Sequence, residues 1–341
     1  MTTAHEPDPV YLAAEAERLQ LLASPVPGRV LHVLCTLRVP DALLDGPRSV
    51  PELAAAADCD ADALARVLRV AARLDVVEEE APGRWSLRPA GRLLCEGGPG
   101  GGLRAEFADN DLFTLWTGFL HSVRTGESCY REVFGSTLFE RLSRQPAERE
   151  VFHQHMRERA HLVYPPLVPS GLWPDTGVLV DLGGGTGGLL EQLLEARPGL
   201  SGVLHDLPDV LELSPLAADP RLAARVRLMP GDLFTGPLPD GDVYVLASVL
   251  HDWPDPRAAD ILTCCRAACR PGTRLLVLDR VLAERGGTLS LHNDLLMLAA
   301  CGGRERTMAD WRALAGRCGF EITEVQGAAG TDLSILEFRP A

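Results

Sequence analysis

The stretch that decides the fold is Val178-Leu179-Val180-Asp181-Leu182-Gly183-Gly184-Gly185-Thr186-Gly187-Gly188. Its apolar, partly β-branched start predicts a buried strand that ends near Asp181. The glycines predict a turn in which the backbone comes close to a ligand, and residues 189–194 predict a helix that begins with unpaired N–H groups. Strand, glycine turn and helix in this order are typical of a nucleotide-type cofactor site at the carboxyl edge of a parallel sheet.

Beyond residue 175, strand patterns alternate with helix patterns. The alternation predicts a Rossmann-like α/β domain with a seven-stranded, mostly parallel sheet and helices on both faces. Gly327-Ala328-Ala329-Gly330 joins the last two strands, so the last strand is expected to be antiparallel. The expected strands are 178–182, 202–206, 226–229, 242–248, 273–280, 320–326 and 333–338. The expected helices are about 187–196, 208–217, 256–270, 290–300 and 308–318.

The N-terminal part is predicted to be mainly helical. Apolar residues at helical spacing favour helices within residues 10–40, and helix-start signals occur at 49–53 and 60–64. The runs 76–78 and 84–87 flank a Pro-Gly turn and predict a hairpin. Helix, turn, helix and hairpin make a winged-helix-like arrangement, for which DNA binding and a docking or dimerisation module are the alternatives. The many acidic residues in this region favour the second.

A glycine cluster at residues 97–102 is the clearest linker of the chain. It divides a helical domain, 1–102, from a helical linker, 103–170, and a cofactor-binding domain, 171–341. Aromatic residues are spaced along the helical linker. Because clefts between domains are favoured binding sites, we expect this segment to contribute to a substrate pocket.

Composition excludes several classes of function. The net charge is −14, which argues against a nucleic-acid partner, because phosphate binding needs a basic face. All 33 basic residues are arginine, and without lysine neither a Schiff base nor a Walker-type phosphate loop is available. No apolar run approaches the ~20 residues of a membrane span. The first residues, 1–8, lack signal-peptide features, so a cytoplasmic protein without a membrane association is expected.

No metal site is expected. The nine cysteines contain no Cys-x-x-Cys pair and are interpreted as small buried side chains in a reducing compartment. His153 and His155 would lie on different faces of a helix, and His155 and His161 are also poorly spaced for shared ligation.

Three acidic residues bear on the choice of cofactor. Gly183-x-Gly185-x-x-Gly188 also matches the dinucleotide pattern, but the carboxylate of Asp181 would be a poor neighbour for a pyrophosphate and suits a cationic group. Asp206 lies where a ribose diol would bind, and Asp232 is placed to accept from an adenine amino group. The alternatives are that Asp206 caps the helix at residue 208 and that Asp232 is a turn residue.

A catalytic group is predicted in Ser248-Val249-Leu250-His251-Asp252-Trp253-Pro254. His251 follows a strand beside the cofactor strands, and imidazole takes up a proton near neutral pH. Asp279 ends the next strand and Glu305 follows a Gly-Gly-Arg segment, so either carboxylate is placed to orient the imidazole. The structural alternatives are an ion pair of Asp279 with Arg280 and a helix N-terminal charge for Glu305.

At this point the chain resembles the S-adenosylmethionine-dependent O-methyltransferases, in their caffeate/flavonoid-like and bacterial natural-product branch. The resemblance rests on Asp-Leu-Gly-Gly-Gly-Thr-Gly, His-Asp-Leu-Pro, Gly-Asp-Leu-Phe, His-Asp-Trp-Pro-Asp and Gly-Gly-Arg-Glu-Arg-Thr, in this order. It implies methyl transfer from S-adenosylmethionine, with S-adenosylhomocysteine as product and no metal. It also implies a homodimer formed by the N-terminal domain.

The resemblance assigns roles to individual positions. Catalytic roles fall on His251, Asp279 and Glu305. The residues expected to contact the cofactor are Asp181, Gly183, Gly185, Asp206, Leu207, Asp232, Leu233 and Ser248. The residues expected to contact the substrate are Phe113, Trp116, Met156, Asp252, Asn293 and Met297. Plant members usually have Glu at position 279 and Lys at 247, where this chain has Asp and Ala.

Two reactions are compatible with these motifs. The first is O-methylation of a small aromatic or polyketide-type hydroxyl, with His251 as general base. The alternative keeps the fold and the cofactor site but performs non-methylating chemistry, such as hydroxylation, decarboxylation or a pericyclic reaction. A winged-helix regulator is the third and least favoured interpretation.

Overall fold

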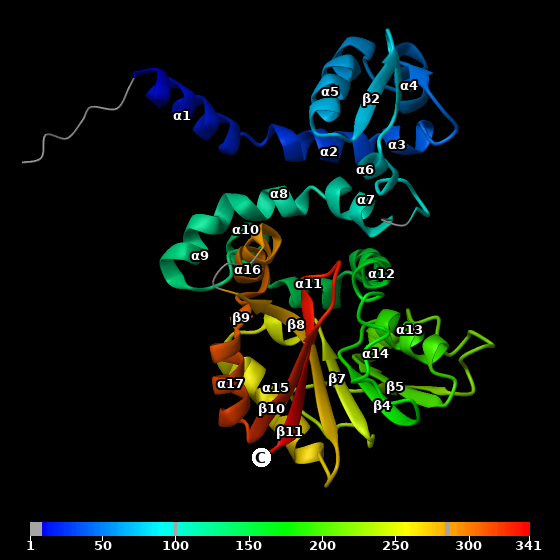
Figure 1. The fold of residues 1–341 in the computed structure, drawn as a ribbon, viewed down its shortest axis with the longest axis vertical. Coiled ribbons are helices and arrows are strands. Elements are labelled where there is room, and N and C mark those ends of the chain that lie inside the picture. The colour runs from blue at the N-terminus through cyan, green and yellow to red at the C-terminus, as the bar shows by residue number, and fades with distance from the viewer. Residues whose placement is uncertain (1–8, 99–100, 284–286) are drawn as a thin grey trace, which may run out of the picture. The chain divides into compact units, whose positions relative to one another are not determined.

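The computed structural model describes residues 9–98, 101–283 and 287–341. The chain forms two compact units, one ending at Asn110 and the other spanning Asp111–Ala341 (Figure 1). The predictions for residues 1–8 and for the middle of the glycine cluster, 99–100, lie outside the described residues. Among the described helices, none is long and apolar enough to cross a membrane.

The first unit is mainly helical, as predicted. Its helices are α1 (Pro9–Leu22), α2 (Val26–Thr36), α3 (Val39–Ala42), α4 (Val50–Ala57), α5 (Ala61–Arg73), α6 (Pro89–Arg92) and α7 (Gly101–Ala108). Strands β1 (Arg48–Ser49), β2 (Val77–Ala81) and β3 (Arg84–Leu87) form a small sheet in the order β1-β3-β2. The expected hairpin is the antiparallel pair β2 and β3.

Two helices of this unit begin at capping residues that the sequence indicates. Ser49 accepts from the Glu52 N–H while Glu52 accepts from the Ser49 N–H, which makes a capping box at α4. Asp60 caps α5 by accepting from the Ala63 N–H. The first part of the predicted linker also belongs to this unit, because Leu103 and Phe107 of α7 pack against its core. The division into three functional segments stays a prediction.

The second unit begins with helices that precede its sheet. These are α8 (Asp111–Leu115), the 3₁₀ turn η1 (Trp116–Gly118), α9 (Phe119–Thr125), α10 (Tyr130–Phe134), α11 (Leu138–Arg144) and α12 (Pro146–Val163). The helices α13 (Gly188–Ala196), α14 (Pro208–Leu211), α15 (Asp255–Ala268), α16 (Thr288–Cys301) and α17 (Met308–Arg317) follow, with the 3₁₀ turn η2 (Leu250–Asp252).

The sheet of the second unit has the predicted seven long strands. They are β4 (Gly177–Leu182), β5 (Leu200–Asp206), β6 (Val226–Pro230), β7 (Val243–Ala247), β8 (Arg274–Leu282), β10 (Phe320–Gly327) and β11 (Leu333–Pro340), in the spatial order β10-β11-β8-β7-β4-β5-β6. Only β11, the last strand, runs antiparallel to both neighbours. A short strand that the sequence patterns did not predict, β9 (Arg306–Thr307), pairs with the end of β8.

Helices cover both faces of this sheet (Figure 1). Alternate residues of a strand face opposite sides, so Leu179 packs with the leucines of α13 whereas Val180 packs with α15 and α17. Two apolar layers result, and together they hold the carboxyl ends of β4, β5, β7 and β8 at one edge. The predicted functional residues follow these strand ends.

One predicted helix is much shorter in the structure. The helix expected at 208–217 ends at Leu211. Pro215 explains part of the difference, because a proline disfavours the helical conformation of the residue before it. That residue, Ser214, directs its hydroxyl to the Thr186 carbonyl oxygen at 3.0 Å. The segment after α14 therefore supports the glycine turn instead of continuing the helix.

Candidate active site

The glycine turn encloses a buried carboxylate. Asp181 is 1% exposed, and neither of its carboxylate oxygens has a hydrogen-bond partner among the described residues. A Cβ at position 184 would lie 2.5 Å from the Asp181 Cγ, so only glycine lets the turn close over this side chain. Burial, with a smaller contribution from Asp206, raises the pKa of Asp181 to about 7. A cationic group of a ligand, such as an ammonium, would compensate the charge of this carboxylate.

The turn also binds Asp206. Gly185, in the left-handed region at φ +59°, donates its N–H to Asp206 Oδ2 at 2.8 Å, and the Leu207 N–H donates to Oδ1 at 2.7 Å. Burial raises the pKa of Asp206 to about 6, although these two hydrogen bonds act against it. The N-cap of α14 is Leu207 and has no side-chain cap bond, so Asp206 does not cap the helix. The free lone pairs of its carboxylate fit a diol.

Leu233 lies beside the turn, and Asp232 precedes it. A Cβ at Gly183 would be 3.1 Å from Leu233 Cδ1, which places the leucine against the glycine backbone. Asp232 accepts from the Phe234 N–H at 2.8 Å, which is the turn role considered as an alternative. Phe234 packs edge-on against Trp253, with ring centroids 4.8 Å apart. The Asp232 role toward an adenine stays a prediction.

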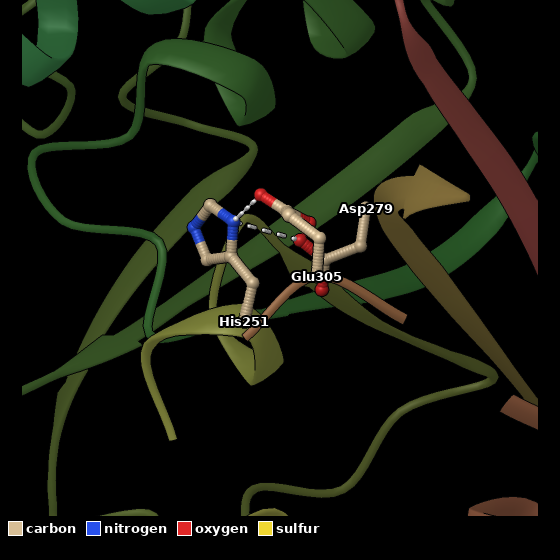
Figure 2. Close-up of side chains that lie close together, drawn as sticks. All are labelled: His251, Asp279 and Glu305. Carbon is tan, nitrogen blue, oxygen red and sulfur yellow. Dashed lines mark hydrogen bonds and ion pairs between the residues drawn. The ribbon is translucent and has the colours of Figure 1, made fainter. Parts of the chain in front are cut away.

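His251 lies in η2, close to two carboxylates (Figure 2). Its Nδ1 donates to Glu305 Oε1 at 2.9 Å and is 3.6 Å from Asp279 Oδ1. Its Nε2 is 3.7 Å from Asp252 Oδ1, beyond hydrogen-bond distance. Glu305 thus fixes the tautomer in which Nδ1 carries the proton, and Nε2 is left to act on a ligand.

The charges around His251 favour its protonated form. Burial, the largest influence, lowers its pKa, but Asp279, the hydrogen bond to Glu305 and Asp252 together raise the pKa to about 9. Burial raises the pKa of Asp279 to about 7 and that of Asp252 to about 6, and His251 opposes both shifts. The cluster is therefore built to stabilise an imidazolium.

Glu305 is held by donors from several elements. The Asn293 side-chain amide donates to Oε1, and Arg280 Nη1 donates to the same oxygen at 3.5 Å. Arg280 also pairs with Asp332 at 2.6 Å, so among the described residues its ion pairs are with Glu305 and Asp332 and not with Asp279. The capping box of α17 consists of Thr307 and Asp310. Asp279 is therefore not the ion-pair partner of Arg280, and Glu305 is not part of the capping box of α17.

The backbone of His251 is held by the segment before α17. The Arg304 N–H donates to the His251 carbonyl oxygen at 2.8 Å, and a Cβ at Gly303 would lie 2.0 Å from that oxygen. The fully buried Arg306 donates to the carbonyl oxygens of Leu250 and Trp253, at 2.8 and 2.9 Å. The segment Gly-Gly-Arg-Glu-Arg thus supplies both a partner for the imidazole and a clamp for its loop.

The same three side chains are close enough to be considered as metal ligands. One ligand atom each of His251, Asp279 and Glu305 lies within 4.8 Å of the others. Glu305 Oε1 already accepts from the Asn293 amide and the Arg280 guanidinium, and a second cation near this group would be repelled by the guanidinium. The donors fit a hydrogen-bonded histidine–carboxylate cluster better than a metal centre.

The remaining predicted residues lie on several elements of the second unit. Asn293 is on α16 but contacts Glu305, so the structure adds a role to the predicted substrate contact. Ser248 follows β7 and accepts from the Tyr164 hydroxyl. The other predicted substrate contacts are Phe113 on α8, Trp116 on η1, Met156 on α12 and Met297 on α16, and their contacts with a ligand stay predictions.

Sequence reasoning missed Tyr164, Arg280 and Arg306 as parts of the site. Arg306 is part of the Gly-Gly-Arg-Glu-Arg-Thr motif, and its position next to Glu305 could have indicated a role in the site. Tyr164 is one of the aromatic residues spaced along the predicted helical linker, and no spacing distinguishes it from the others.

Comparisons with known proteins identify the family of this chain. The family described as O-methyltransferase domain matches residues 116–321, and the O-methyltransferase dimerisation domain matches residues 19–97. The chain is similar to an O-demethylpuromycin-O-methyltransferase of Streptomyces alboniger, at 36% identity over 96% of this chain and 89% of the relative. It is also similar to an aclacinomycin 10-hydroxylase of Streptomyces purpurascens, at 36% identity over 94% of this chain and 89% of the relative.

A solved structure extends the likeness to the fold. An O-methyltransferase from neocarzinostatin biosynthesis, in complex with S-adenosylmethionine and 2-hydroxy-5-methyl naphthoic acid, has a TM-score of 0.81 and 32% identity. The match covers 95% of this chain and 98% of the other. The chain therefore belongs to the O-methyltransferase family, with its methyltransferase domain and its dimerisation domain, and is an O-methyltransferase by family.

Proposed function

We propose that this protein binds S-adenosylmethionine and methylates a hydroxyl group of a small aromatic or polyketide-type natural product, with His251 as general base. One observation carries the proposal. The buried His251, 7% exposed, bonds Glu305 through Nδ1 and leaves Nε2 for a substrate, at the sheet edge that also holds the unpartnered Asp181. The proposed base and the proposed cation site at Asp181 thus lie at the same edge of the sheet, where the parallel strands end.

The chain's residues divide the work of methyl transfer. When bound, S-adenosylmethionine supplies an electrophilic methyl on a sulfonium. Asp181 would hold the ammonium of its amino-acid end, and Asp206 would hold the ribose hydroxyls. His251 Nε2 would remove the proton from the substrate hydroxyl and leave its oxygen nucleophilic, while Glu305 and Asp279 would stabilise the imidazolium. Burial of the cluster keeps water away from the reacting oxygen.

Similar proteins support the proposed acceptor class and the proposed assembly. The puromycin enzyme and the structure with a bound naphthoic acid are named after aromatic natural products, which supports an aromatic hydroxyl as acceptor. The dimerisation domain at 19–97 supports a homodimer. Several leucines of α1 that are half exposed or more in the isolated chain would be covered in such a dimer: Leu12, Leu19, Leu21 and Leu22.

Turnover with a defined base variant tests the proposal. Protein is incubated with S-adenosylmethionine and a panel of phenols, naphthoates and anthracycline-type hydroxyls, and products one methyl group heavier are sought by mass spectrometry. His251→Ala should lower the rate about 10²- to 10⁴-fold, as loss of a general base does. His292→Ala is the matched control, because this exposed histidine bonds only a carbonyl of its own helix. An unchanged rate in His251→Ala would remove the base role.

The hydroxylase relative favours one second candidate. At 36% identity over 94% of this chain, it indicates that the same scaffold also serves non-methylating chemistry. In that case the proposed cofactor would act by its charge and position, and its methyl group would stay in place. Counting S-adenosylhomocysteine per product separates the two: one equivalent supports methyl transfer, and none supports the alternative.

A further inference from the structure

We propose that Tyr164 is a positioning residue that fixes the main-chain turn between β7 and His251 by bonding Ser248. This inference deepens the proposed function and relies on it for the kinetic part of its test. Tyr164 is the C-cap residue that follows α12, and its hydroxyl donates to Ser248 Oγ at 3.1 Å. The contact joins two segments that are 84 positions apart in the sequence.

Ser248 has a backbone conformation that needs support. It follows the last residue of β7 and precedes the loop of His251, and its φ is +52°, in the left-handed region that disfavours residues other than glycine. Its N–H donates to the Leu278 carbonyl oxygen at 2.8 Å, next to Asp279. The turn at Ser248 thus sets the direction of the chain after β7 and the position of His251.

The Tyr164 hydroxyl is suited to hold this turn. Its ring lies in the core that includes α13, so its position is fixed by packing. Burial, above all, and the nearby carboxylates of Asp181 and Asp279 raise the pKa of Tyr164 to about 12. The phenol stays protonated at physiological pH and keeps its donor for Ser248.

The same residue is also near buried carboxylates of both halves of the site. Asp181 of the glycine turn and Asp279 of the histidine cluster both act on it electrostatically. Both carboxylates lack hydrogen bonds within the described chain. Tyr164 is therefore within electrostatic reach of both the buried carboxylate of the glycine turn and that of the histidine cluster.

The first readout needs neither substrate nor cofactor. Tyr164→Phe keeps the ring and removes only the hydroxyl. In its crystal structure without ligands, Ser248 should leave the left-handed region and the His251 loop should shift. Tyr244→Phe is the matched control, because this buried tyrosine of β7 donates to the Pro239 carbonyl oxygen at 2.8 Å away from the site. If Ser248 keeps its positive φ in Tyr164→Phe, the proposal is wrong, whatever reaction the enzyme performs.

The second readout is a double-mutant cycle in turnover. We expect Tyr164→Phe to lower kcat about five- to tenfold, the effect of one hydrogen bond, while the Kd for S-adenosylhomocysteine changes less than about threefold. Ser248→Gly adopts the left-handed turn without strain, so adding Tyr164→Phe to it should cost less than about twofold. Equal losses in both backgrounds, or a fall in affinity with unchanged kcat, would overturn the positioning role. If no turnover of any kind is found, the proposed function fails but the crystallographic readout still decides the inference.

Discussion

The Asp181 and Glu305 carboxylates are both almost fully buried, but their surroundings differ. Glu305 accepts from His251, Asn293 and Arg280, so its charge is compensated within the chain. Asp181 has no donor within the described residues, and its turn is closed by glycine around it. A buried charge without a partner is costly unless something else supplies one. The difference supports the proposal that Asp181 binds a cationic group of a ligand, whereas Glu305 pairs with His251 of the protein itself.

The largest expected effect comes from removing the unpartnered charge. Asp181→Asn should weaken S-adenosylhomocysteine binding about 30-fold or more, because a buried charge pair loses one partner. The same change should raise the thermal midpoint of the ligand-free protein, because an uncompensated buried carboxylate disappears. Calorimetric titration and thermal unfolding measure the two effects.

Asp240→Asn, at an exposed ion pair with Arg270, is the control and should change neither quantity. The wild-type affinity should also rise with pH up to about 7, since the bound cation needs the ionised carboxylate of Asp181, whose pKa is raised to about 7. Asp181→Asn should lose that pH dependence. A variant that binds normally would mean that the unpartnered carboxylate has no ligand role.

The second effect separates the two carboxylates beside His251. The active base is neutral, so a pKa of about 9 for His251 places the rising limb of kcat/KM near pH 9 in the free enzyme. Removing either negative charge lowers this pKa and moves the limb to lower pH. Asp279 acts on this pKa through its charge, whereas Glu305 acts through a hydrogen bond and its charge, so the limb should move in both variants, and Asp279→Asn should move it with the smaller loss of rate.

Glu305→Gln should instead give the larger loss of rate at its own pH optimum, about tenfold to a hundredfold, because the residue holds the tautomer. Full pH profiles of kcat/KM for both variants decide the matter. If Asp279→Asn lost more rate than Glu305→Gln, the orienting role would belong to Asp279. A limb that stays near pH 9 in both variants would show that the titrating group is not His251.

Much of this site could be predicted from the sequence because strand ends of a parallel sheet meet at one edge. That rule brings Asp181, Asp206 and His251 together without knowledge of any contact. It does not say where side chains from later helices point, so the contact of the Asn293 amide with Glu305 was not predicted. Tyr164 meets Ser248 only through the packing of α12, which no local spacing encodes. The helix predicted at 208–217 ends at Leu211, and the proline at 215 is a local signal that explains part of this difference.

The smallest effect concerns the clamp of the His251 loop. A Cβ at Gly303 would meet the His251 carbonyl oxygen at 2.0 Å and the Asp252 carbonyl carbon at 2.5 Å, and backbone atoms cannot move as freely as a side chain. Gly303→Ala should therefore destabilise the protein by about 1–3 kcal/mol through overpacking and lower kcat by displacing the base.

Gly316→Ala provides the contrast within α17, since nothing lies within 4 Å of its Cβ position. Alanine favours the helix there and should stabilise by about 0.5–1 kcal/mol without a change in kcat. Chemical unfolding and steady-state kinetics of the pair test whether glycine at 303 is required by close backbone approach. Equal stability of both variants would mean that the loop of His251 is less firmly held than the contacts of Arg304 and Arg306 indicate.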